Sequence, residues 1–240
     1  MTGETLDSGR MTLVEHLTEL RRRIIICACA IVACSVLMFA LYNQVLSILS
    51  APYEDITHRD LIVTGPLEPF LVRLKIAAYG GIALSIPLIF WEIWRFVTPG
   101  LHKHERRYGI AFLFSSIVLF LMGAAVAWLT LPKALDFLLG VGGDSIEPMI
   151  TADKYLTLVT LMIIAFGVAF EFPLLLIFLL MTRIISTNQL RRSRRWMAVG
   201  ITAFAAVITP SQDPFSLLFM AVPMYLFFEI AIVIGRVMKR

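Results

Sequence analysis

The chain has 240 residues, of which 59% are hydrophobic and only 16% are charged, with a formal net charge of +4. Soluble domains usually contain about 25% charged residues, so this composition excludes a soluble globular domain and indicates that lipid surrounds most of the chain. Because the basic residues flank apolar segments, we interpret the positive charge as a signal of membrane orientation and not as a nucleic-acid-binding surface.

Six apolar segments are candidates to cross a bilayer, which requires about 20 residues per helix. The predicted spans are residues 24–42, 69–97, 110–131, 155–181, 196–208 and 215–235. The fifth would reach only roughly 20 Å as a helix, which is short of the ~30 Å hydrocarbon core. We therefore predict one all-α, six-helix transmembrane domain over residues 11–240, preceded by a mobile extension at residues 1–10.

Basic residues are distributed unevenly among the predicted loops. Most of the 21 lysines and arginines lie before span one, between spans two and three, between spans four and five, and at the C-terminus. The remaining loops carry acids such as Glu54, Asp60 and Asp144. Because lysine and arginine accumulate on the cytoplasmic side, both termini are predicted to be cytoplasmic.

An amphipathic stretch, MTLVEHLTELRRR, occupies residues 11–23. Thr12 and Glu15 have the spacing of a capping box, which predicts that a helix begins here. Glu19 then has two interpretations. On spacing alone the simpler one is a pair with Arg23 one turn later. The other is a carboxylate held at the membrane surface for a cationic partner.

The loop FVTPGLHKHERRYG, residues 96–109, is rich in charge. Glu105 either neutralises its basic neighbours or accepts a bidentate hydrogen bond from an incoming guanidinium. A metal site formed by His102, His104 and Glu105 is a weak alternative, because two histidines separated by one residue have no further ligand nearby. We expect no metal and no cofactor.

Two acidic residues, Glu92 and Glu229, lie toward the cytoplasmic ends of predicted spans two and six. Their positions favour snorkelling to the surface or pairing with Arg95 and Arg236 respectively. Both interpretations make these carboxylates structural.

Glu171 lies in the middle of an otherwise apolar run, LMIIAFGVAFEFPLLLIFLL. An ionised carboxylate at this depth costs at least ~2.5–3.5 kcal/mol on insertion scales. Pro173 follows it and cannot donate a hydrogen bond to the carbonyl of Ala169, which weakens the helix. We predict a polar notch in a bent helix, with a buried carboxyl bonded within the bundle as the alternative.

The segment 209–229 joins the short fifth span to the sixth, and Asp213 is placed to cap the last helix. The sequence contains no H-E-x-x-H, G-x-S-x-G or Walker motif. We therefore expect a protein that is not an enzyme.

Four segments together resemble the TatC family, the multispanning receptor subunit of the twin-arginine protein translocase. They are HLTELRRR (16–23), WRFVTPGLHKHERR (94–107), AFGVAFEFP (165–173) and TP…DPFS…VPMYLFFE (209–229). The resemblance covers about residues 11–236 and implies a curved, glove-like bundle with short fifth and sixth spans in the bacterial inner membrane. The family often has a proline before the aspartate of the last external turn, where this chain has Gln212.

The resemblance also implies a function and a site. Members bind twin-arginine signal peptides of folded proteins at their cytoplasmic face, with Glu105 and Glu19 receiving the arginine pair and Arg21 and Phe96 lining the same surface. Glu171 would lie on the concave face, and Asp213 would be a second polar position for partners. The implied partners are single-span Tat subunits of the TatA and TatB type, membrane lipids and further copies in the receptor complex, assembling under the proton-motive force.

Two other functions remain open on sequence alone. A proton-coupled small-solute carrier would use Glu171 as its protonatable group, although the chain lacks the inverted repeats and paired broken helices of such carriers. A passive membrane scaffold would tolerate Glu105→Gln without any loss of cargo binding. A carrier should depend most on Glu171, whereas a receptor should depend most on Glu105 and Glu19.

Overall fold

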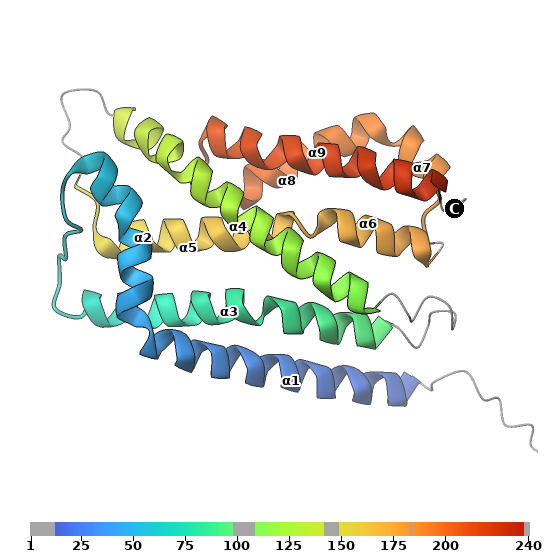
Figure 1. The fold of residues 1–240 in the computed structure, drawn as a ribbon, viewed down its shortest axis with the longest axis horizontal. Coiled ribbons are helices and arrows are strands. Elements are labelled where there is room, and N and C mark those ends of the chain that lie inside the picture. The colour runs from blue at the N-terminus through green and yellow to red at the C-terminus, as the bar shows by residue number, and fades with distance from the viewer. Residues whose placement is uncertain (1–12, 98–108, 142–148, 183, 238–240) are drawn as a thin grey trace, which may run out of the picture.

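The computed structural model describes residues 13–97, 109–141, 149–182 and 184–237, and most of these are helical (Figure 1). The helices are α1 (Leu13–Ala40), α2 (Tyr42–Thr57), α3 (Glu68–Val97), α4 (Gly109–Gly140), α5 (Ala152–Ala169), α6 (Phe172–Met181), α7 (Thr187–Arg192), α8 (Arg194–Ile208) and α9 (Pro214–Val237). An isolated parallel bridge between Ile62 and Thr151 joins two of the loops. The all-helical membrane fold predicted from composition is confirmed for this part of the chain.

Five described stretches are long and apolar enough to cross a membrane. They are Val14–Ala40, Glu68–Phe96, Gly109–Gly140, Ala152–Met181 and Pro214–Val237. The predicted fifth span corresponds to α8, whose 15 residues extend roughly 22 Å. The prediction of a short sixth span is wrong, because α9 has 24 residues and exceeds the bilayer requirement. The amphipathic segment near the N-terminus is continuous with the first span in α1, while Thr12 of the predicted capping box lies outside the described residues.

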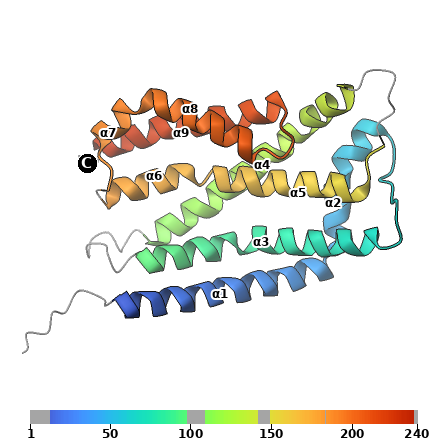
Figure 2. The same cartoon turned by 180° about the vertical axis from the view of Figure 1, so that it is seen from behind.

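The helices form an open bundle in which α1 and α3 lie side by side and α4 crosses the others obliquely (Figures 1 and 2). The start of α1, the end of α3, the start of α4 and the end of α9 lie at one end of the bundle, and α2 lies at the other. We call the first of these the α1–α3 end. The described chain therefore begins and finishes at the same end.

Glycine allows the helices of this bundle to touch backbone to backbone. A Cβ atom on Gly81 of α3 would lie 2.6 Å from the backbone nitrogen of Ser35 in α1. A Cβ atom on Gly123 of α4 would lie 2.5 Å from the carbonyl oxygen of Phe166 in α5. Lipid provides little hydrophobic driving force for helix association, so small residues at such crossings stabilise the bundle by allowing close van der Waals packing.

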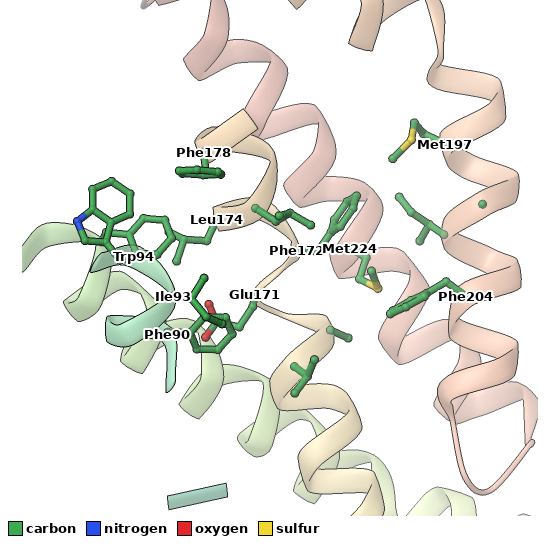
Figure 3. Close-up of a pocket in the computed structure, with 16 residues that line it drawn as sticks. Phe90, Ile93, Trp94, Glu171, Phe172, Leu174, Phe178, Met197, Phe204 and Met224 are labelled. Atoms are coloured by element: carbon green, nitrogen blue, oxygen red, sulfur yellow. The ribbon is translucent and has the colours of Figure 1, made fainter. Parts of the chain in front are cut away.

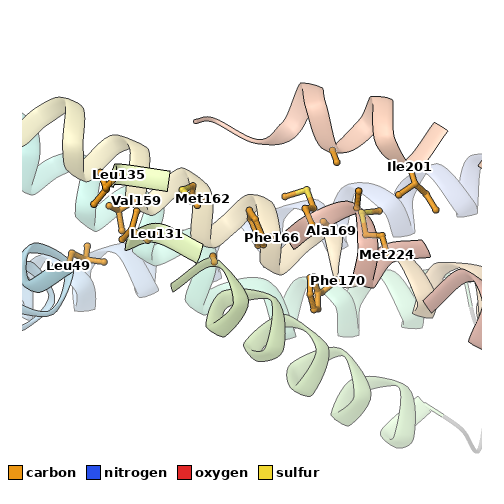
Figure 4. Close-up of a cluster of buried hydrophobic side chains, with 14 of the residues drawn as sticks. Leu49, Leu131, Leu135, Val159, Met162, Phe166, Ala169, Phe170, Ile201 and Met224 are labelled. Atoms are coloured by element: carbon orange, nitrogen blue, oxygen red, sulfur yellow. The ribbon is translucent and has the colours of Figure 1, made fainter. Parts of the chain in front are cut away.

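The buried core runs along α5 and gathers side chains from α4, α6, α8 and α9 (Figure 4). Its members include Leu131, Leu135, Val159, Met162, Phe166 and Phe170. In contrast, none of the most apolar part of α1 is buried within the protein. The chain thus has a packed inner body, with α1 held against it chiefly through α3.

The fourth span is interrupted where Pro173 was predicted to weaken it. α5 ends at Ala169, α6 starts at Phe172, and Phe170 and Glu171 between them keep right-handed helical backbone angles. The interruption lies within one crossing segment, and it places Glu171 at the N-terminal end of α6. The predicted weakening of the helix is confirmed.

Candidate functional site

Three charged side chains near the α1–α3 end form a continuous ionic chain, which we call the Glu19–Arg23–Glu92 triad. Nη2 of Arg23 donates a short hydrogen bond to Oε1 of Glu19, and Nη1 donates to Oε2 of Glu92 at 2.8 Å. A second arginine approaches from the other side, since Nη1 of Arg95 lies 3.6 Å from Oε1 of Glu92. One guanidinium thus joins two carboxylates that are 73 positions apart in sequence.

The triad is largely removed from solvent. The side chain of Glu92 is 7% exposed, that of Arg23 is 13% exposed and that of Glu19 is 21% exposed. At this depth each charge requires a partner, because an unpaired buried charge is strongly destabilising. The pairing of Glu19 with Arg23, which the sequence favoured, is confirmed. The pairing of Glu92 with Arg95 is also present, but Arg23 of the neighbouring helix is the nearer partner.

Hydrogen bonding within the triad is incomplete on both sides. Oε2 of Glu19 and Nε of Arg23 are buried and have no hydrogen-bond partner among the described residues. A carboxylate can accept two parallel hydrogen bonds from one guanidinium, and here Glu19 receives only one from Arg23 within this part of the chain. The site therefore keeps capacity for a further donor.

Phe96 lies beside the triad and closes the end of α3 against α1. Its ring stacks on His16, with ring centroids 4.4 Å apart and an angle of 23° between the planes. Phe96, Arg23 and Glu92 line one groove of about 360 Å³ between the two helices. Arg21 is exposed on α1 within the same turn as Glu19. The structure thus brings three of the four predicted peptide-binding residues to this end.

The fourth, Glu105, lies outside the described residues, as do His102 and His104 of the weak metal hypothesis. The residues that flank this segment are described, and both lie at the α1–α3 end. Gly109 packs so closely on Trp94 that a Cβ atom there would lie 2.6 Å from the indole nitrogen. Among the side chains that the structure does describe, no three His, Cys, Asp or Glu residues gather as metal ligands would.

Glu171 occupies a different environment in the middle of the bundle. The residue is 5% exposed, and its carboxyl group borders a cavity of about 590 Å³ between α3, α6, α8 and α9 (Figure 3). Ser116 of α4 donates a hydrogen bond to Oε1 at 3.0 Å, while Oε2 is buried without a partner in the described chain. One oxygen is therefore bonded within the bundle, as the alternative interpretation held. Sequence spacing gave no sign of Ser116.

The other two acidic positions have structural partners. Glu229 pairs with Arg194 of α8 at 2.6 Å, so the predicted pairing with Arg236 is wrong, because the start of α8 packs beside α9. Asp213 is 1% exposed and accepts a 2.7 Å hydrogen bond from the backbone nitrogen of Ser216, which confirms the predicted helix cap. The preceding Gln212 has φ = 48°, a conformation that proline cannot adopt.

The fold and these sites define a helical membrane protein that crosses the bilayer several times and concentrates buried charge at one end. The family model described as "Sec-independent protein translocase protein (TatC)" matches residues 15–223. The TatC protein of Frankia casuarinae is 39% identical over 244 residues, covering 96% of this chain and 67% of that protein. The TatC protein of Magnetococcus marinus is 37% identical, with coverage of 95% and 85%.

Solved structures agree with the sequence matches. A crystal structure described as the twin arginine translocase receptor TatC superposes with a TM-score of 0.79 at 36% identity, covering 94% of this chain and all of that one. The chain belongs to the TatC family. It is accordingly a subunit of a Sec-independent protein translocase and not an enzyme.

Proposed function

We propose that this chain is the receptor subunit that binds twin-arginine signal peptides of folded cargo, and that the α1–α3 end is its binding face. The observation that carries the proposal is the Glu19 carboxylate, which already holds a guanidinium, that of Arg23, and retains a buried oxygen without a partner in the described chain. A site that accepts one guanidinium in this manner has the chemistry required to accept another. The likeness to a solved twin arginine translocase receptor supports the same function.

Recognition of arginine over lysine follows from the geometry of the two side chains. Guanidinium presents a planar fork that matches both oxygens of a carboxylate, whereas the lysine ammonium is a compact point charge. We assign one arginine of the signal to Glu19 and the other to Glu105, with Phe96 and Arg21 lining the surface between them. The segment that carries Glu105 joins the end of α3, which lies beside α1, to the start of α4 at the same end of the bundle (Figure 1).

The α1–α3 end is proposed to face the cytoplasm of a bacterium whose inner membrane holds the protein. Exposed arginines gather there on α1, α7 and α8, including Arg21, Arg22, Arg191 and Arg195. Basic residues that flank short loops remain on the cytoplasmic side during insertion. Both termini are therefore cytoplasmic in this proposal, where a signal peptide on a folded cargo first arrives.

Assembly with single-span Tat subunits is the second part of the proposal. Glu171 borders an apolar cavity that extends to α8 and α9, and Asp213 lies in the turn between these helices. An apolar helix from a partner subunit packed along this surface would find a carboxyl group with a free oxygen at mid-membrane. The receptor would thus nucleate the translocation site when cargo and the proton-motive force are present.

The carrier hypothesis is not favoured by the comparisons, since the matched family is a protein translocase. In this chain Glu171 borders a cavity enclosed mainly by apolar side chains, which offers few groups to bind a polar solute.

Site-specific crosslinking tests the receptor proposal directly. A photoreactive amino acid is placed at residue 20 or at residue 103, which keeps both Glu19 and Glu105, and the full chain in lipid nanodiscs is illuminated with a peptide carrying two consecutive arginines before an apolar stretch. The proposal expects crosslinks at both positions, and expects their loss when the arginines are replaced by lysines. A probe at Glu54, which is exposed on α2 at the opposite end, is the matched control. Equal crosslinking at Glu54, or indifference to the lysine replacement, would contradict the proposal.

A further inference from the structure

Arg23 occupies the carboxylate that the proposed function assigns to an incoming arginine. It comes from the same helix as Glu19, one turn later, and its guanidinium is shared with Glu92 of α3. A ligand that approaches Glu19 therefore meets a site in which a chemically identical group is already bound.

The bond between Arg23 and Glu19 is the more exposed half of this arrangement. Glu19 is three times as exposed as Glu92, at 21% against 7%. A small cavity of about 70 Å³ adjoins the triad and is lined by Glu19, Arg22, Arg23, Ile26, Glu92 and Arg95. This space is large enough to hold water beside the carboxylates.

Exchange at Glu19 leaves every charge with a partner. When an incoming arginine takes Glu19, Arg23 still holds Glu92 at 2.8 Å, and Arg95 remains on the other oxygen of Glu92. Since an unpaired buried charge is the main penalty in breaking such contacts, the presence of Glu92 makes the displacement feasible. Without Glu92, Arg23 would have Glu19 as its remaining carboxylate partner in the described chain and would hold it more firmly.

We infer that Arg23 is an intramolecular competitor for the signal's arginine, and that Glu92 is the residue that receives Arg23 when the signal binds. The inference rests on the proposed function, because it concerns the regulation of the same Glu19 site. In the empty receptor Arg23 covers Glu19, and in the occupied receptor the ligand's guanidinium replaces it. The cost of displacing Arg23 is the same for every ligand of Glu19, so the competition lowers the affinity of each ligand by one common factor.

The affinity of a labelled twin-arginine peptide for the full chain in nanodiscs measures this competition. Arg23→Gln should tighten binding about tenfold, the factor that corresponds to losing one competing ionic contact. Glu92→Gln should weaken binding severalfold, because Arg23 then remains on Glu19. The double variant Arg23→Gln/Glu92→Gln should bind as tightly as Arg23→Gln alone, since Glu92 acts only through Arg23.

Two controls separate competition from a general effect of charge. Arg22→Gln removes a positive charge from the same cavity without removing a donor to Glu19, so its effect should stay within about twofold. A peptide with lysines in place of both arginines should gain affinity from Arg23→Gln by the same factor as the arginine peptide, because one ligand-independent cost has been removed. A gain confined to one of the two peptides would contradict competition at Glu19.

The inference is overturned if Arg23→Gln binds no more tightly than the unmodified chain, or if Glu92→Gln weakens binding equally in the presence and absence of Arg23. Arg23→Lys, which keeps the charge but removes the fork, should give an intermediate affinity. It replaces Arg23→Gln in the comparison if the latter does not fold, as judged by thermal unfolding. Failure of the proposed function is recognised separately, because Glu19→Gln would then leave peptide affinity unchanged.

Discussion

Glu92 and Glu171 are equally buried, each residue with 5% of its surface exposed, yet the two carboxylates have different kinds of partner. Glu92 lies between two arginines from different helices. Glu171 has one hydroxyl donor and a second oxygen without a partner in the described chain. Depth of burial therefore does not decide the role of an acidic residue in this bundle; the charge of its neighbours does.

The two carboxylates differ in how their charge is compensated. The arginines around Glu92 compensate its charge, and Arg23 joins α1 to α3 where little else buries α1. Glu171 has no ion pair among the described residues and borders a large cavity. Variants that alter one region should leave the other nearly unchanged, and this expectation can be tested.

The largest effect is expected where α1 and α3 touch. A Cβ atom introduced by Gly81→Ala would lie 2.1 Å from Oγ of Ser35 and 2.6 Å from its backbone nitrogen, so the helices must move apart. Overpacking of this kind costs about 1–3 kcal/mol. Thermal unfolding should show the loss, and peptide affinity should also change because the triad is stretched. Gly140→Ala, which meets nothing within 4 Å, is the control and should be close to neutral.

A second pair of variants compares the two buried carboxylates directly. Glu92→Gln removes the carboxylate near Arg95 and one of the two carboxylates on Arg23, and it should cost up to about 3 kcal/mol in unfolding free energy. Glu171→Gln keeps an oxygen for Ser116 and removes no ion pair among the described residues, so its cost should be below about 1 kcal/mol. Equal losses of stability in the two variants, measured in the same detergent, would contradict the distinction.

Ser116→Ala sharpens the description of the Glu171 region. The substitution removes the hydroxyl that donates to Oε1 at 3.0 Å and leaves a buried oxygen without that donor. The expected loss is about 1–2 kcal/mol, provided that no water replaces the hydroxyl. The unfolding free energy of Ser116→Ala/Glu171→Leu should be higher than that of Ser116→Ala. The double variant removes both polar partners, so it should recover much of the lost stability.

The smallest effect is expected at the opposite end of the bundle. Lys75 pairs with Asp153 at 2.6 Å, but their side chains are 40% and 31% exposed. Exposed ion pairs contribute about 0–1 kcal/mol, and salt screens them. Lys75→Met should therefore change the unfolding free energy by less than about 1 kcal/mol and leave the affinity for the peptide unchanged. A loss of unfolding free energy as large as that of Glu92→Gln would contradict the expectation that this exposed ion pair contributes little to stability.

Much of the fold was predictable because lipid imposes a simple rule on length and apolarity. The spans follow from the length of the apolar runs. The helix break before Pro173, the cap at Asp213 and the pair of Glu19 with Arg23 all depend on residues within about one turn of each other. The partners that were missed come from other helices: Arg23 for Glu92 and Arg194 for Glu229. Local spacing cannot reveal a contact that arises from helix packing. The short sixth span was implied by the resemblance alone, whereas the apolar run at residues 215–235 already indicated a helix of sufficient length.

The family-derived assignment of the binding residues stays a prediction at Glu105, which lies outside the described residues. Glu19 and Phe96 were correctly placed at one end of the molecule, and the resemblance supplied that grouping. The spacing of Glu19 and Arg23 predicted that an arginine of the chain itself holds the acidic site, but it did not predict that Glu92 shares this arginine. The sharing depends on the register between α1 and α3, which the close approach at Gly81 sets.

The most direct test of the account compares two variants for one ligand. The affinity of a twin-arginine peptide is measured for Glu19→Gln and Glu171→Gln in nanodiscs of the same lipid composition. The account predicts at least a tenfold loss for Glu19→Gln and a change within about twofold for Glu171→Gln, because one carboxylate receives the guanidinium and the other lies in the mid-membrane cavity. Unchanged affinity in Glu19→Gln together with a large loss in Glu171→Gln would contradict it.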